Sequence, residues 1–206
     1  MRKNTNRHLL KKMGIKKHQI KKISLTLVAL LSIACCFCQN NHFYEVKFKD
    51  IQHKVLKMSE FKGKKIIIAV MDAARPHGKS LQLLLTLDTI YKVNKAKMVV
   101  IAIPMVDNGN IMKEGDMQKF LQAILHISYP IAECSKIKKK NGNNQHSLFK
   151  WLTDKTYNKH FDKDADQGGQ LFIINESGEL YAELNTQSRS TNANELKKIL
   201  NLQSVK

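Results

Sequence analysis

Cysteine is nearly absent from the greater part of this chain. Of its four cysteines, Cys35, Cys36 and Cys38 cluster near the N-terminus, and only Cys134 lies beyond them. A single cysteine cannot close a disulfide within the body of the chain, so the body has to be held by an apolar core. Phe, Leu, Ile and Val are plentiful beyond residue 43, and they are sufficient for a sizeable core without cross-links.

Acidic residues are missing from the first 22 positions, which hold nine Lys or Arg and no Asp or Glu. The whole chain has 35 basic and 17 acidic residues and a net charge of +18, of which +9 remains without this leader. The run Lys136–Lys140 favours attraction to anionic surfaces. No aromatic residues are interleaved with these lysines and no nucleic-acid-binding motif accompanies them, so nucleic acid is not an expected partner.

The apolar run Ile23–Cys38 is too short to span a membrane comfortably. A basic leader, an apolar run and the small residues Ser32 and Ala34 at its end are typical of a secretory signal cut before Cys35. The stretch "LSIAC" also resembles the lipobox of bacterial lipoproteins, with Leu31 one place too far from the cysteine.

These features predict a signal peptide over residues 1–34, a tether over residues 35–42 and Cys35 as a lipidation site. We therefore expect an exported protein, in the bacterial periplasm or at a membrane surface, whose partner is the membrane through an N-terminal lipid anchor. The alternative is a signal anchor that stays attached to the chain.

The body alternates between strand and helix patterns. Continuous apolar runs at Ile66–Met71 and Lys97–Pro104 predict two central strands, and the leucine-rich segment between them predicts a helix capped by Ser80. Two parallel strands joined by a helix, then a hairpin around Glu176–Gly178 and a closing helix, predict a thioredoxin-like α/β sandwich over residues 43–206. The expected sheet is central and mixed, with flanking helices.

The remaining elements follow from shorter patterns. They are a half-buried strand across Tyr44–Phe48, a helix over Glu114–His126, a short helix over His146–Thr156, and a last helix opened by a capping box of Asn192 and Glu195.

The turn between the first central strand and its helix has the sequence "AARPHGKS", Ala73–Ser80. It fits a loose phosphate-binding pattern in which amides at a helix start and Lys79 face a phosphate, with Gly78 and Ser80 beside it. The first glycine of that pattern is missing, and Pro76 removes an amide. The predicted sheet also ends in an antiparallel hairpin, whereas nucleotide-binding sheets of this kind are mostly parallel. Phosphate binding at this turn is thus the weaker alternative.

Four segments in matching order resemble the glutathione peroxidase family. They are "FKGKKIIIAVMDAA", "VVIAIPMVDNG", "NGNNQHSLFKWL" and "LFIINESGELYAEL", against the family's "FKGK", "GFPCNQFG", "VNG…HPLYKWL" and "WNFTKFLVDREG". The resemblance runs from about Val46 to Leu184, and Asn141–Leu152 is its most specific part. It implies a thioredoxin-like fold and a thiol-dependent peroxidase ancestry.

The family's chemistry requires a cysteine or selenocysteine at the helix start, where a thiolate attacks a peroxide oxygen. Carried over, that position falls on Pro76 or His77. The supporting Gln falls on Asp107, and the Trp-Asn pair falls on Gln167 and Gly168. Since neither a thiol nor its partners are present, the resemblance implies a degenerate member. We expect an exported domain without peroxidase activity, with a binding or structural role and no cofactor.

Three other constellations offer alternatives. Cys134 is an alternative nucleophile for a thiol peroxidase or reductase, although we expect an inert, partly buried thiol. Asp162, Asp164 and Asp166 have the spacing of a calcium loop, but the glycine comes one place late and Ile173 replaces the bidentate Glu. Asp72 and His77 are candidates for a local metal or acid–base pair. We expect a solvated acidic loop, a solvated histidine and no metal site.

Overall fold

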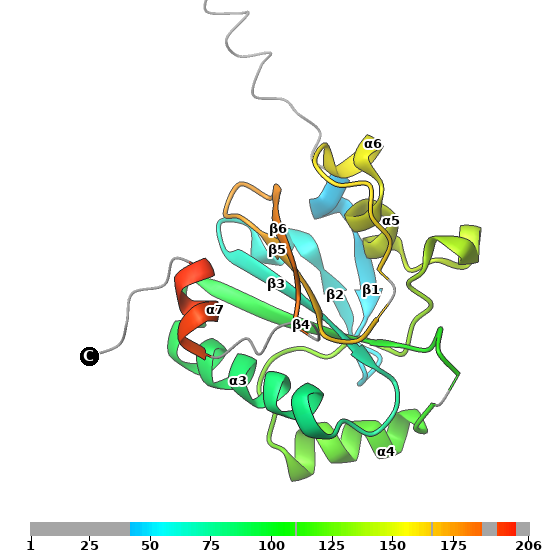
Figure 1. The fold of residues 1–206 in the computed structure, drawn as a ribbon, viewed down its shortest axis with the longest axis vertical. Helices are drawn as coiled ribbons and strands as arrows, with labels where there is room; N and C mark the ends of the chain where they lie inside the picture. Colours follow the sequence, from blue (N-terminus) through cyan, green and yellow to red (C-terminus); the bar gives the residue numbers. More distant parts are fainter. Residues whose placement is uncertain (1–41, 110, 166, 187–192, 201–206) are drawn as a thin grey trace, which may run out of the picture. The chain divides into compact units, whose positions relative to one another are not determined.

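Four strands form a single sheet at the centre of the computed structural model, which describes residues 42–109, 111–165, 167–186 and 193–200. Their order across the sheet is β4-β3-β5-β6. The bounds are β3 Lys65–Asp72, β4 Met98–Met105, β5 Gln170–Ile174 and β6 Leu180–Asn185. The predicted hairpin around Glu176–Gly178 is the connection between β5 and β6, and Figure 1 shows it as the orange pair.

The sheet is mixed, as expected. β3 runs parallel to β4, from the pair Lys65–Met98 to the pair Asp72–Met105, and antiparallel to β5. Every residue of β4 and the middle six residues of β3 are buried, which explains why both strands are continuous apolar runs in the sequence. The helix α3, Gly78–Asn94, joins the two parallel strands. The predicted α/β class with a central mixed sheet is confirmed.

One face of the sheet is covered by three helical segments. These are α3, the helix α4 at Glu114–Gln118 continued by π-helical turns at Lys119–Ile124, and α7 at Ala193–Ile199 (Figure 1). The odd-numbered β3 residues Ile67, Ala69 and Met71 pack into this layer together with α3 and α7. The alternation of side chains along a strand therefore assigns half of β3 to this core.

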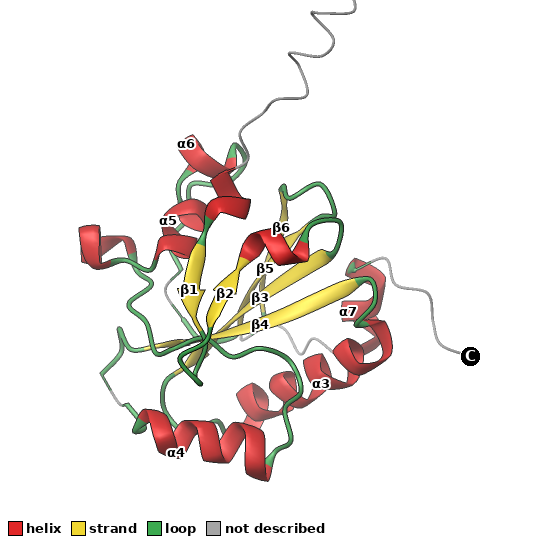
Figure 2. Cartoon of the chain, turned by 180° about the vertical axis from the view of Figure 1, so that it is seen from behind, coloured by secondary structure: helices red, strands yellow, loops and turns green. Residues whose placement is uncertain are grey.

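The opposite face carries a layer built from two separate parts of the chain, residues 42–61 and residues 147–158 (Figure 2). It consists of a 3-10 turn at His42–Glu45, the hairpin β1 Lys47–Lys49 and β2 Val55–Lys57, a 3-10 turn at Met58–Phe61, α5 Ser147–Thr153 and α6 Lys155–Asn158. Phe43, Phe149 and Phe172 are fully buried there, and the rings of Phe149 and Phe172 meet edge to face at 5.9 Å.

Some predicted elements differ from the structure. The strand expected across Tyr44–Phe48 is wrong in its first half. A 3-10 turn at His42–Glu45, which buries Phe43, takes its place, and β1 begins only at Lys47. The helix expected over Glu114–His126 changes to π-helical turns after Gln118. A 3-10 turn at Lys139–Asn144 precedes α5, with its chain reversal at Gly142, where φ is 54°.

Other predictions fall on residues outside the described part of the chain. The signal peptide at residues 1–34, Cys35 and the tether up to Asn41 belong here, and so does Asn192 of the last capping box. Within the described ranges no helix is long and apolar enough to cross a membrane.

Candidate functional site

The turn between β3 and α3 is built from residues 73–77, and it carries no sulfur atom. The amide of Ala73 donates to the Met105 carbonyl at 2.9 Å, and the Ala73 carbonyl accepts from the Met112 amide at 2.8 Å. Pro76 is buried and His77 is exposed. The position carried over for the family's nucleophile is thus held by a packed ring or by a solvated imidazole.

Asp72 and His77 do not pair with each other. Asp72 Oδ1 accepts from Asn108 Nδ2 at 3.3 Å, while His77 Nδ1 lies 3.2 Å from the Arg75 carbonyl oxygen. The Arg75 guanidinium stacks 4.7 Å from the centroid of the Phe120 ring. These contacts fix the turn without bringing an acid and a base together.

The start of α3 differs from the predicted cap. His77 is the N-cap, and Ser80 is the third helical residue. The Ser80 hydroxyl donates to the His77 carbonyl at 2.8 Å and accepts from the His77 amide at 3.3 Å. Both hydrogen-bonding roles of the hydroxyl are therefore used within the turn. Lys79 is exposed, and Gly78 adopts a φ of 52°. Phosphate binding at these three residues remains a prediction.

Asp107, at the carried-over glutamine position, has a structural role. Its carboxylate accepts a hydrogen bond from the Ile137 amide at 2.7 Å and another from Asn141 Nδ2. The adjacent Asn108 bridges Asp72 and the Lys138 ammonium, which donates to Asn108 Oδ1 at 3.0 Å. The side chains after β4 therefore tie the segment around residue 138 to the end of β3.

Gly168 lies against the end of β3. A Cβ atom at position 168 would come within 2.5 Å of Asp72 Oδ2 and 3.1 Å of the Asp72 amide nitrogen. Position 168, on which part of the carried-over Trp-Asn pair falls, therefore lies against Asp72, and a side chain there requires the Asp72 carboxylate to move. The neighbouring Gln167 donates its amide to Gln170 Oε1 at 3.2 Å.

Cys134 lies on the far side of β4 from the turn. Met105 pairs with Asp72 on one side and bridges to Ser135 on the other, so β4 separates the segment of Cys134 from β3. Cys134 is half-buried against the core formed with α3 and α4. Burial raises the pKa of its thiol, and the carboxylates of Glu114 and Glu133 raise it further. Both effects disfavour the thiolate that a nucleophile needs.

Comparison with known proteins gives matches in structure but not in sequence. No family model matches the chain, and no curated protein matches it in sequence. The apo crystal structure of Trgpx superposes with a TM-score of 0.56 and 16% identity, covering 77% of this chain and 92% of the other. For T. cruzi GPX1 these values are 0.54 and 19%, with 77% and 93% covered. The chain has a thioredoxin-like fold.

The same fold occurs in disulfide oxidoreductases. A DsbF homologue from Corynebacterium diphtheriae matches with a TM-score of 0.52 and 12% identity, over 76% of this chain and 82% of that one. The matched glutathione peroxidases and oxidoreductases share this fold with the chain. At such identities the likeness establishes the thioredoxin-like fold and not the chemistry.

The acidic loop with the spacing of a calcium site forms contacts with neighbouring protein groups in this thioredoxin-like fold. Asp162 forms an ion pair with Lys139, and Asp164 Oδ1 accepts from the amides of Lys139 and Ala165, both at 2.9 Å. Asp166 lies outside the described residues. Among the residues that the structure does describe, no group of three His, Cys, Asp or Glu is placed to hold a metal ion.

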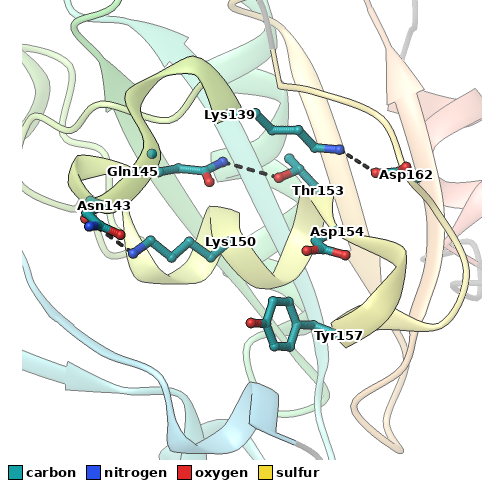
Figure 3. Close-up of a pocket in the computed structure, with 9 residues that line it drawn as sticks. Lys139, Asn143, Gln145, Lys150, Thr153, Asp154, Tyr157 and Asp162 are labelled. Atoms are coloured by element: carbon teal, nitrogen blue, oxygen red, sulfur yellow. Dashed lines mark hydrogen bonds and ion pairs between the residues drawn. The ribbon is translucent and has the colours of Figure 1, made fainter.

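A polar pocket of about 460 Å³ opens between the 139–145 segment and the helices α5 and α6 (Figure 3). Its wall combines two lysines, two aspartates and several neutral polar groups: Lys139, Gly142, Asn143, Gln145, Lys150, Thr153, Asp154, Tyr157 and Asp162. Sequence reasoning singled out the segment Asn141–Leu152 as the most specific part of the resemblance but assigned it no site. Neither Cys134 nor the turn residues line this pocket.

Proposed function

We propose that this protein is an exported, non-catalytic relative of the thiol peroxidases, which uses a thioredoxin-like scaffold for binding. The observation that carries the proposal is the turn after β3, where the fold ordinarily presents its thiol and where this chain has Pro76 and His77. Reduction of a peroxide by thiol attack transfers oxygen to sulfur and releases water or an alcohol. Neither proline nor histidine supplies the sulfur that this cycle oxidises and then reduces.

The positions around the turn support the same conclusion. Asp107 accepts two hydrogen bonds from residues 137 and 141, so its carboxylate serves the scaffold. Gly168 leaves no side chain beside the turn, and the Asp72 carboxylate fills the adjoining space. A negative charge next to the turn would also oppose formation of a thiolate there.

The protein is expected to consume no hydrogen peroxide or organic hydroperoxide above the uncatalysed rate, with either glutathione or thioredoxin as reductant. The reason is that the single cysteine of the body, Cys134, is kept as a thiol by burial and by Glu114. Peroxide loss is measured for the wild type and for Cys134→Ser, which should be indistinguishable. Turnover that disappears in Cys134→Ser would instead establish the rival function, a peroxidase or reductase acting through that residue.

Export and lipid attachment form the second part of the proposal, and their support is the basic leader followed by "LSIAC". The full chain expressed in a bacterial host is expected to incorporate labelled palmitate, and Cys35→Ser is expected to lose the label, because diacylation occurs on the cysteine that follows the cut. Cys36→Ser, a change one residue away, serves as the matched control and should retain the label. Equal labelling of wild type and Cys35→Ser would contradict the anchor.

A further inference from the structure

We propose that the pocket between the 139–145 segment and α5–α6 binds a small zwitterion, an α-amino acid with a free ammonium and a free carboxylate. The inference rests on the binding role proposed above and assigns it a site and a ligand class. The first support is size, since about 460 Å³ lies within the range of small-molecule sites.

The second support is a pair of opposite charges that do not neutralise each other. Lys150 lies in α5, and Asp154 is the extended residue that ends α5 and caps α6, so the two opposite charges line the pocket from different elements. Here the Lys150 ammonium donates to the Asn143 carbonyl at 3.2 Å, and Asp154 Oδ1 accepts from the Thr156 amide at 2.7 Å. Among the described residues, neither charge has an opposite charge within ion-pair distance.

The third support is an unused acceptor in the wall. Gln145 is buried, and its Nε2 donates to the Ile137 carbonyl at 2.8 Å and to Thr153 Oγ1 at 3.2 Å. Within the described part of the chain, no group donates to Gln145 Oε1. Figure 3 shows the Gln145 amide held toward Thr153 on one side of the pocket, with Lys150 directed at Asn143 and Asp154 at the start of α6. An ammonium group from a ligand can use both the Asp154 carboxylate and this oxygen.

The remaining charges of the wall cancel each other. Lys139 and Asp162 form an ion pair at the rim, so they add no net charge to the pocket. The lining carries no net formal charge, and among the described residues Lys150 and Asp154 form no ion pair. Hydrogen bonding lowers the pKa of Asp154, and Lys139 and Lys159 lower it further, although neither lysine lies within ion-pair distance of it. A ligand with both signs satisfies Lys150 through its carboxylate and Asp154 through its ammonium, whereas a simple anion leaves Asp154 without a partner. The ring of Tyr157, 52% exposed, offers an apolar surface for the ligand's side chain.

The test uses the full chain and the standard L-amino acids, one at a time, with calorimetry and amide chemical shifts as readouts. At least one amino acid is expected to bind saturably and to shift the amides of residues 139–157. Its N-acetyl and carboxamide derivatives, which each lack one charge, are expected to bind about tenfold more weakly or worse, because each loses a charge-assisted hydrogen bond.

Two variants remove one charge each without removing the fold. Lys150→Met keeps the aliphatic stem, and Asp154→Asn keeps a side chain that caps α6. Each is expected to weaken binding about tenfold. Lys47→Met, at an exposed lysine of β1, is the matched control and should leave the affinity unchanged.

Three results would overturn the proposal: no saturable binding of any amino acid, equal affinity for the blocked derivatives, or sensitivity to Lys150→Met without sensitivity to Asp154→Asn. The last would identify a simple anion site. The peroxide measurement and the binding measurement are independent. A lack of amino-acid binding would contradict the pocket proposal but not the absence of peroxidase activity. Peroxide turnover would contradict the non-catalytic function but not amino-acid binding in this pocket.

Discussion

Gly168→Ala is expected to lower the free energy of unfolding by about 2 kcal/mol. The added Cβ would lie 2.5 Å from Asp72 Oδ2 and 2.9 Å from Asp72 Cγ, so the carboxylate must move away from Asn108. The backbone cannot retreat easily, because the adjacent Gly169 amide donates to the Val70 carbonyl at 2.8 Å. Denaturant unfolding, followed by circular dichroism, measures the change.

The control for this prediction is Gly115→Ala. A Cβ at Gly115 meets no atom within 4 Å, and the residue lies in α4, so alanine there is expected to be neutral or to stabilise by up to about 1 kcal/mol. The double variant Gly168→Ala, Asp72→Ala removes the two closest atoms and should recover part of the lost stability. Equal stability of Gly168→Ala and the wild type would show that this contact is not tight.

The same contact bears on function. Gly168 stands where the resemblance implies an asparagine of the peroxidase site. The Cβ of Gly168→Asn would meet the same Asp72 atoms as the Cβ of alanine, so restoring that site requires the Asp72 side chain to move or change as well as a cysteine in the turn.

Acidification from pH 7 to pH 4 is expected to lower the free energy of unfolding by about 2 kcal/mol through His146. Burial lowers the pKa of His146 to about 4, from 6.5 in the unfolded chain. Between these values the unfolded state binds more protons, so stability is fully present above pH 6.5 and is lost as the pH falls toward 4. The full shift corresponds to about 3 kcal/mol, and solvent contact of the partly exposed ring lowers its contribution to about 2 kcal/mol.

The structure gives the cause of this loss. His146 Nδ1 accepts the Leu148 amide at 3.2 Å at the start of α5, and the ring packs against Phe48 and Phe149. Protonation removes the acceptor and places a charge between two aromatic rings.

Two carboxyl groups, Asp154 and Asp88, have pKa values below the ordinary value of an aspartate. The Thr156 amide lowers the pKa of Asp154, and hydrogen bonds from Lys92 and Ser128 outweigh burial at Asp88. Their contributions are lost mainly below pH 4.

The measurement is urea unfolding at several pH values for the wild type and for His146→Asn. Asparagine preserves an N-cap acceptor but does not titrate, so the slope of stability against pH between 4 and 6.5 should largely disappear. His160→Asn, at an exposed histidine, should keep the wild-type profile. If the slope of the free energy of unfolding against pH is unchanged in His146→Asn, a group other than His146 takes up the proton.

The sequence by itself determined the central sheet and its order of elements. The runs Ile66–Met71 and Lys97–Pro104 are apolar throughout because β3 and β4 are covered on both faces. The leucine-rich segment between them forms α3, and the turn signal at Glu176–Gly178 joins β5 and β6. The sequence alone also shows that residues 73–77, which form the turn after β3, contain no cysteine or methionine.

Only the tertiary structure decided which side chains act together. Asp107 and Asn141 are 34 residues apart, and their hydrogen bond ties the segment after β4 to the turn before α5. The contact of Gly168 with Asp72 and the separation of Cys134 from the turn by β4 likewise depend on strand pairing. The spacing of apolar residues within one segment indicates whether it forms a helix or a strand and which of its side chains are buried. Distances between segments depend on how the layers pack, and no local pattern contains that information.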